Sequence, residues 1–149
     1  MCIRDRYCRT AKVKLPPQVV VWIASKSSST DSSRKRLPEH IPLSDVVVNI
    51  ESTARVLSCF YEGDFENLQS CEDRIHQAAR LNHCPESKAV FEKGHEIEGL
   101  HLAWLSGAGP SVAFLGTDEF CAALMSNEFP GGKFFSLEPD SNGLVVLDE

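Results

Sequence analysis

The stretch HLAWLSGAGPSVAFL, residues 101–115, joins two runs of apolar β-forming residues through the glycine-rich segment Ser106–Ser111. Gly107 and Gly109 permit backbone conformations that other residues avoid, so successive N–H groups can converge on an anion or on a neighbouring loop. The phosphate-binding P-loop and the dinucleotide fingerprint both lead into a helix, whereas Pro110 and a second apolar run follow here. The stretch therefore predicts two strands joined by a glycine-rich turn, either without a ligand or packed against an anion or another loop.

The segments before this hairpin predict a strand followed by a helix. Residues 19–23, VVVWI, form a continuous run of β-formers between two prolines and a Ser-rich loop, which is typical of a buried strand. Apolar residues at positions 43, 46, 47, 50, 54, 57 and 61 have the spacing of an amphipathic helix over Leu43–Tyr61. We expect Ser44 to cap this helix and Gly63 to end it.

Three further helices and two closing strands complete the predicted fold. Asp64 is the expected N-cap of a helix with Phe65, Leu68, Cys71, Ile75 and Ala78 on one side. Pro85 opens a third, weaker helix, and Thr117 caps a fourth that ends before Pro130. Residues 134–137 and 144–147 are the closing strands, with turns at 131–132 and 142–143. This order predicts an α+β fold.

Composition excludes several classes of protein. The 149 residues carry 15 Lys+Arg against 21 Asp+Glu, a net charge of -6, which argues against a nucleic-acid partner. The longest purely apolar run, 19–24, is far shorter than a membrane-spanning helix. Six cysteines without C-x-x-C spacing or a signal peptide indicate reduced thiols in a cytoplasmic protein, and neither they nor the histidines have metal-ligand spacing. Residues 1–10 lack periodicity, and we interpret them as a non-native leader before a single domain over 11–149.

Two polar clusters accompany the glycine-rich turn. Asp73, His76, Gln77 and Arg80 have offsets of three and four, so a helix would place them on one face, as either a solvated surface or a carboxylate or phosphate site. In the segment Thr30–Pro38, Thr30 can cap a short helix that places Arg34 one turn along.

The order of these motifs resembles the homoserine kinases of the GHMP small-molecule kinase superfamily. The resemblance covers about residues 19 to 125 and rests on four segments: T-x-x-x-R-x-x-L-P at 30–38, P-L-x-D-x-V-x-N at 42–49, D-R-x-H-Q-x-x-R at 73–80 and S-G-[AS]-G-P-[ST] at 106–111. It implies the ferredoxin-like C-terminal domain of these kinases, with an antiparallel sheet and packed helices. It also implies ATP-dependent phosphorylation of L-homoserine, a step toward threonine.

The resemblance also implies roles for individual residues. Arg34 and Arg80 would bind the homoserine carboxylate beside Thr30, supported by Asn49, Asp73, Arg74, His76 and Gln77. The loop Ser106, Gly107, Ala108 and Gly109 would pack against the phosphate-binding loop of another domain. No catalytic residue and no metal ligand is assigned.

The family's phosphate-binding motif, P-x-x-x-G-L-x-S-S-A, does not occur in this sequence. We therefore expect the chain to be the C-terminal portion of a homoserine kinase, whose N-terminal domain would bind ATP and Mg²⁺, and we expect it to be inactive alone. Two alternatives stay open: another GHMP kinase acting on mevalonate, shikimate or a sugar, and a stand-alone module that binds an amino acid. A homodimer is also left open, and no membrane partner is expected.

Overall fold

The computed structural model describes residues 12–27, 29, 33–35 and 37–142. The leader assigned to residues 1–10, the predicted role of Thr30 and the strand expected at 144–147 therefore lie outside the described residues. Within the described part of the chain, no helix has the length and apolar character needed to cross a membrane.

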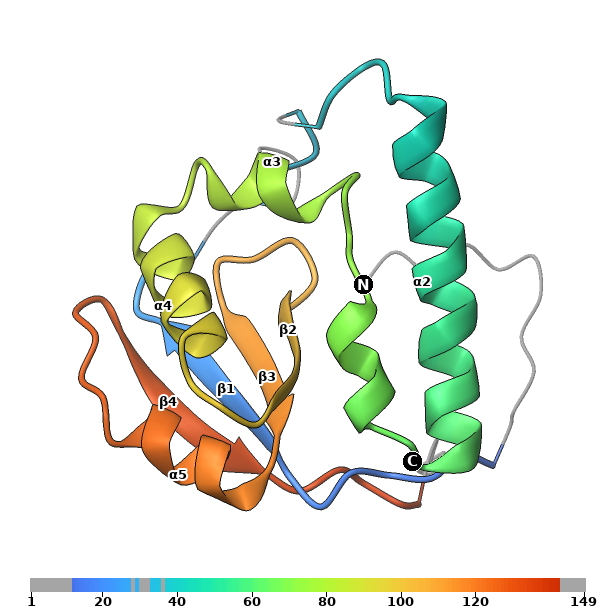
Figure 1. The fold of residues 1–149 in the computed structure, drawn as a ribbon. Helices are drawn as coiled ribbons and strands as arrows, with labels where there is room; N and C mark the ends of the chain where they lie inside the picture. Colours follow the sequence, from blue (N-terminus) through green and yellow to red (C-terminus); the bar gives the residue numbers. More distant parts are fainter. Residues whose placement is uncertain (1–11, 28, 30–32, 36, 143–149) are drawn as a thin grey trace, which may run out of the picture.

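A four-stranded antiparallel sheet forms the centre of the fold (Figure 1). Its strands are β1 (Val19–Ala24), β2 (Leu100–Leu105), β3 (Val112–Gly116) and β4 (Gly132–Leu137), arranged in the order β2-β3-β1-β4. β1 pairs with β3 and with β4, and β2 pairs with β3, each time antiparallel. With helices between β1 and β2 and again between β3 and β4, this is the split β-α-β arrangement of ferredoxin-like folds. The predicted α+β class is confirmed.

One face of the sheet is covered by α4 (Pro85–His95) and α5 (Asp118–Met125). Val20 and Phe114 are register partners on β1 and β3, and both are fully buried. They belong to one core cluster with Val90 of α4 and Phe120 of α5. Both helices begin at predicted residues: Pro85 is at the first turn of α4, and the Thr117 hydroxyl accepts a hydrogen bond from the Phe120 amide.

The opposite face is covered only in part. The 3-10 helix η1 (Glu66–Ser70) lies between the sheet and the long helix α2 (Leu43–Glu62), as Figure 1 shows. Leu68 of η1 and Cys59 of α2 form a second buried cluster with Leu115 of β3. On β1 the cover is incomplete: Val20 and Trp22 are fully buried, but Ile23 is 46% exposed, so the predicted buried strand is fully buried on one face only.

Three sequence-based expectations about helix boundaries are also wrong. Pro42, not Ser44, is the N-cap of α2, and no side chain caps it, whereas Gly63 ends the helix with φ 79° as expected. The helix expected from Asp64 is two elements: η1, whose N-cap is Phe65, and α3 (Gln77–Leu81). Extended backbone at Cys71 separates them, because the Ser52 hydroxyl of α2 accepts a hydrogen bond from the Glu72 amide and holds this segment against α2.

Gly94 marks the closest approach of α4 to the sheet. A Cβ atom on this glycine would lie 2.3 Å from Cε1 of Phe114, inside the main core. We expect Gly94→Ala to lower the free energy of unfolding by about 1 to 3 kcal/mol through overpacking. Helix propensity alone favours alanine by about 1 kcal/mol, so a net loss identifies the clash.

Urea unfolding followed by circular dichroism measures this difference. Ala89→Gln, at an exposed position of the same helix, is the control and should change stability by less than about 0.5 kcal/mol. A Gly94→Ala variant more stable than the parent protein would show that α4 does not pack this closely on Phe114.

Candidate functional site

The loop between β2 and β3, residues 106–111, is a tight turn with left-handed glycines. The Ser106 amide donates to the Ser111 carbonyl over 2.8 Å, and the Gly109 amide donates to the Ser106 carbonyl over 3.1 Å. Gly107 and Gly109 have φ of 61° and 79°, conformations that favour glycine. The two glycines thus serve the turn itself, as the sequence indicated.

Arg80 ties α3 to this loop. Its Nη1 donates a hydrogen bond to the Gly107 carbonyl over 3.0 Å, and its Nε is buried without an acceptor among the described residues. Gln77, one turn earlier on α3, accepts from the Leu105 amide through Oε1 over 3.2 Å. Both predicted residues of α3 therefore contact the glycine-rich turn or the residue just before it.

The segment that carries Arg34 reaches the same loop through its neighbour Ser33. The Ser33 hydroxyl donates to the Ala108 carbonyl over 3.0 Å, and Ser33 is only 2% exposed. The Ser33 amide donates to the Ser29 carbonyl, Ser33 and Arg34 have helical backbone, and Arg34 is exposed. Two of the predicted motifs thus meet at consecutive carbonyls of the loop.

A third segment holds the far side of the loop. The Ser87 hydroxyl, in the first turn of α4, donates to the Pro110 carbonyl over 2.6 Å and is 1% exposed. Neither Ser33 nor Ser87 was predicted from the sequence as a site residue. Ser33 lies inside the T-x-x-x-R segment, which was a usable signal, but no local pattern marks Ser87.

Asn49, Asp73 and His76 form a separate network that holds the start of α3 against α2. Asn49 donates to Asp73 Oδ1 over 2.9 Å, and the amides of Ile75 and His76 donate to the same oxygen over 3.0 and 2.9 Å. Asn49 Oδ1 accepts from the Arg74 amide over 2.9 Å, so the asparagine holds both ends of a short turn. The side chains of these residues position α3 and make no hydrogen bond to the glycine-rich loop or to the Arg80 guanidinium among the described residues. The Arg80 amide donates to the His76 carbonyl over 3.1 Å at the start of the helix.

The pKa of Asp73 reflects this network. Partial burial raises the pKa of the carboxyl, but the hydrogen bonds from Asn49, His76 and Ile75 and the nearby imidazole lower it more, and the net pKa lies below its ordinary value. The Arg74 guanidinium pairs with Glu72 over 2.6 Å and approaches Asp45 at 3.8 Å. Arg74 therefore contacts acidic side chains rather than the loop.

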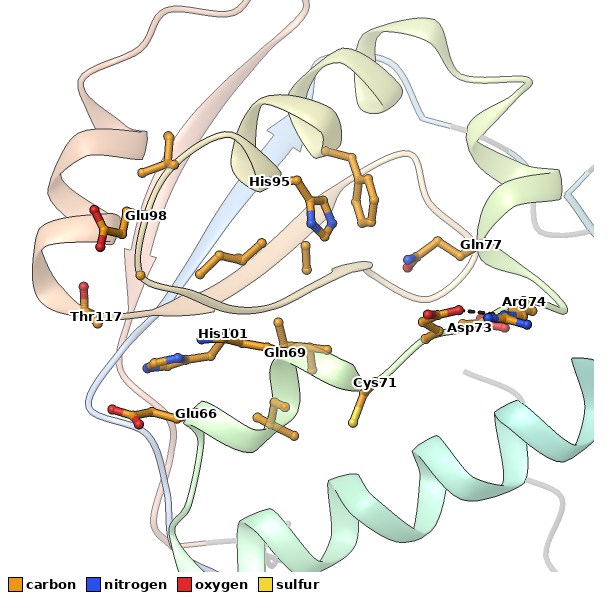
Figure 2. A pocket seen from close by; sticks show the side chains of 18 residues that line it. Glu66, Gln69, Cys71, Asp73, Arg74, Gln77, His95, Glu98, His101 and Thr117 are labelled. Carbon is orange, nitrogen blue, oxygen red and sulfur yellow. Dashed lines mark hydrogen bonds and ion pairs between the residues drawn. The ribbon is translucent and has the colours of Figure 1, made fainter.

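A hollow of about 860 Å³ lies between η1, β2 and α4 (Figure 2). Asp73, Arg74 and Gln77 line one end of it, and Glu98 and Thr117 line the other. Arg34 and Arg80 do not line it, so this hollow is not the place where the arginine segments meet. Among the residues the structure describes, no three His, Cys, Asp or Glu side chains gather as metal ligands.

A second hollow, of about 520 Å³, lies directly beside the loop. Pro110 and Ser87 form one wall, Lys26, Ser27 and Ser29 come from the segment that leads to Arg34, and His83 and Cys84 follow α3. Each of the three segments that hold the loop thus also borders this hollow. Arg34 and Arg80 do not line this hollow themselves, but residues that neighbour them in the sequence do.

Comparison with known proteins identifies the family. A family model described as "GHMP kinases C terminal" matches residues 56–130, and the chain belongs to this family. The matched region includes α3, the glycine-rich loop and both helices that cover the main core.

Curated relatives of the chain include homoserine kinases. The chain is 31% identical to the homoserine kinase of Campylobacter fetus subsp. fetus over 144 residues, which is 94% of this chain and 49% of the relative. It is 30% identical to that of Clostridium kluyveri over 146 residues, 92% of this chain and 48% of the relative. The chain spans about half the length of the curated relatives it matches.

A solved structure has the same fold. The crystal structure of homoserine kinase from Cytophaga hutchinsonii superposes with a TM-score of 0.72, at 19% identity, over 85% of this chain and 43% of that chain. The predicted GHMP kinase C-terminal fold is therefore confirmed. The individual site residues named from the sequence stay predictions.

The Asp73 network predicts a dependence of stability on pH. Because the folded pKa of Asp73 lies below its unfolded value of about 4, the ionised carboxylate stabilises the fold above pH 4. This contribution is lost as the pH falls through the folded pKa. We expect Asp73→Asn, which removes the charge, to destabilise the protein at pH 6 and to differ less from the parent at pH 3.5.

Urea unfolding at the two pH values measures the difference. Glu72→Gln, an exposed neighbour, is the matched control and should cost at most about 1 kcal/mol at pH 6. An equal loss for Asp73→Asn at both pH values would show that its charge does not stabilise the turn before α3.

Proposed function

We propose that this chain forms the substrate-binding C-terminal half of a homoserine kinase. The complete enzyme transfers the γ-phosphate of ATP to the side-chain hydroxyl of L-homoserine. In this proposal Arg34 and Arg80 bind the carboxylate of homoserine beside the glycine-rich loop. The family membership and the homoserine kinases among its relatives support the assignment.

The observation that carries the proposal is the convergence of both arginine segments on one loop. Ser33, next to Arg34, donates to the Ala108 carbonyl, and Arg80 donates to the Gly107 carbonyl. These hydrogen bonds hold the two segments on adjacent residues of the same turn. A guanidinium presents several donors in a fixed plane and suits a carboxylate, which accepts through two oxygens.

We call the pair Arg34 and Arg80 the carboxylate clamp. Such a clamp suits the chemistry of phosphoryl transfer. Catalysis of this reaction depends mostly on positioning the acceptor hydroxyl and on stabilising charge. An amino acid held by its carboxylate has its side-chain hydroxyl directed away from the clamp. The arginines would therefore orient the acceptor hydroxyl of homoserine, and the loop would hold the arginines in position.

ATP and Mg²⁺ are assigned in this proposal to the remainder of the kinase. Among the described residues, no three His, Cys, Asp or Glu side chains lie together as metal ligands. The P-x-x-x-G-L-x-S-S-A motif is also absent from the sequence. The expected partner of this chain is accordingly a nucleotide-binding domain that packs against the loop 106–109.

Substitution of the arginines tests the carboxylate clamp. In a full-length kinase that contains these 149 residues, we expect Arg34→Ala and Arg80→Ala each to raise the KM for homoserine about 10- to 150-fold. The reason is the loss of a charge-assisted hydrogen bond to the carboxylate, which contributes about 1.5 to 3 kcal/mol. Steady-state kinetics with varied homoserine and saturating ATP provides the measurement.

Lys88→Ala, which removes an exposed positive charge from α4, serves as the control and should leave the KM unchanged. Comparing homoserine with mevalonate, shikimate and galactose as acceptors separates homoserine kinase from other GHMP kinases. An unchanged KM in both arginine variants would contradict the clamp.

Calorimetry distinguishes the C-terminal half of a kinase from a stand-alone amino-acid sensor. We expect the 149-residue chain to bind L-homoserine only weakly, with a Kd of about 1 mM or more, because a half-site provides few contacts. L-Homoserine titrated into the chain without nucleotide provides the measurement. Micromolar binding that Arg80→Ala abolishes would favour a sensor instead of half of an enzyme.

A further inference from the structure

The Ser87 hydroxyl is a buried donor whose acceptor is a carbonyl of the glycine-rich loop. It donates to the Pro110 carbonyl over 2.6 Å, and Ser87 is 1% exposed. A polar group buried this deeply is costly to leave without a hydrogen bond, so the hydroxyl and the carbonyl hold each other in place. The position of Pro110 therefore depends on where α4 holds Ser87.

Ser87 belongs to a helix that is fixed by the main core. Val90, three residues later on α4, is fully buried in the core cluster. Gly94 lies so close to Phe114 that no Cβ atom fits between them. Closely packed interiors transmit a displacement rather than absorb it. The Ser87 hydroxyl is therefore a fixed point from which the core sets the position of the loop.

The three side-chain donors to the loop hold two different limbs of it. Arg80 and Ser33 hold the first limb, residues 107–108, by donating to its two carbonyls. Ser87 holds the second limb, residues 109–111, by donating to its middle carbonyl. Loss of the Ser87 hydroxyl would release the second limb and leave both bonds to the first limb in place. A single substitution can thus separate the roles of the two limbs.

We propose that Ser87 is a positioning residue for phosphoryl transfer, which acts through Pro110 and the second limb of the loop. This inference rests on the proposed function, in which Arg34 and Arg80, at the first limb, bind the homoserine carboxylate. With both limbs held, the loop has one orientation relative to the core, and so has a substrate bound beside it. Transfer requires the acceptor hydroxyl in line with the phosphoryl group, and a misplacement of about 1 Å lowers the rate roughly 100-fold.

The effect of Ser87 also reaches the hollow beside the loop. Ser87 and Pro110 both line this hollow of about 520 Å³, so a shift of the second limb would change its wall directly. The hydroxyl has one proton, and that proton is donated to the Pro110 carbonyl, so it cannot be donated to a substrate at the same time. Ser87 therefore acts through the loop rather than by contact with the reacting groups.

Steady-state kinetics of Ser87→Ala in a full-length kinase that contains these 149 residues tests the proposal. We expect kcat to fall about 10- to 100-fold and the KM for homoserine to change less than about 3-fold, because the bonds to the first limb remain. Ser33→Ala should instead raise the KM more than it lowers kcat, because it releases the segment that carries Arg34. A merely structural role would not separate the two constants in this way.

Cys121→Ala is the matched control for a loss of stability. Cys121 is 2% exposed on α5, and its thiol donates to the Gly116 carbonyl over 4.0 Å, at the end of β3 away from the loop. The substitution removes a buried group from the same core without touching Ser87 or Pro110. It should lower the free energy of unfolding and leave kcat and the KM for homoserine unchanged.

Amide hydrogen exchange in the 149-residue chain tests the anchoring of the loop without any substrate. The Gly109 amide donates to the Ser106 carbonyl across the loop, so its exchange reports how often the loop opens. We expect Ser87→Ala to speed the exchange of this amide about 5-fold or more, because the second limb loses its hydrogen bond to α4. Cys121→Ala should leave the exchange of the Gly109 amide unchanged.

An unchanged kcat in Ser87→Ala would overturn the proposal, and so would a fall in kcat that Cys121→Ala shares. Unchanged exchange of the Gly109 amide would show that Ser87 does not hold the second limb. Failure of the proposed function has a different signature, because the parent kinase would then phosphorylate another acceptor instead of homoserine. A fall in kcat for that acceptor in Ser87→Ala would still support the positioning role.

Discussion

The site depends on three side-chain donors that reach the carbonyls of one loop. Arg80, Ser33 and Ser87 come from segments far apart in the sequence, and they donate to Gly107, Ala108 and Pro110 respectively. In a tight turn, a carbonyl that points away from the strands cannot accept a hydrogen bond from a neighbouring strand. These side-chain donors therefore satisfy carbonyls that would be costly to bury without a hydrogen bond. The same bonds bring α3, the Arg34 segment and α4 together beside one hollow. Without them, the two arginines would belong to unrelated parts of the surface.

The elements with local signals were predictable from the sequence. Pro85 and Thr117 begin their helices through their own backbone and side-chain chemistry, and the two runs around the glycine-rich turn form a hairpin. The break between η1 and α3 was not predictable, because it depends on Ser52 and Asn49 of another helix. Residues 64–80 have an acceptable helical pattern, and tertiary hydrogen bonds override it.

The residues of the candidate site were likewise predictable only in part. Arg80 and the glycine-rich loop were named from the sequence, and the structure joins them by a hydrogen bond. Asn49, Asp73 and His76 were named as supports of a substrate site, whereas in the structure they bond to one another and hold the start of α3. Ser33 and Ser87 hold the loop through single hydroxyl groups, and a single serine is too common to identify from sequence. The face of α2 that packs on the domain was equally hard to predict, because it carries the buried Ser52 and Cys59, whereas large apolar residues such as Ile50 are exposed.

The central claim is that the glycine-rich loop assembles the substrate site. A crystal structure of a full-length kinase that contains these 149 residues, bound to L-homoserine, tests it most directly. The predicted result has the homoserine carboxylate accepting hydrogen bonds from the guanidinium groups of both Arg34 and Arg80, while Arg80 still donates to the Gly107 carbonyl. A carboxylate bound elsewhere, with neither arginine in contact, would contradict the claim that the glycine-rich loop assembles the substrate site.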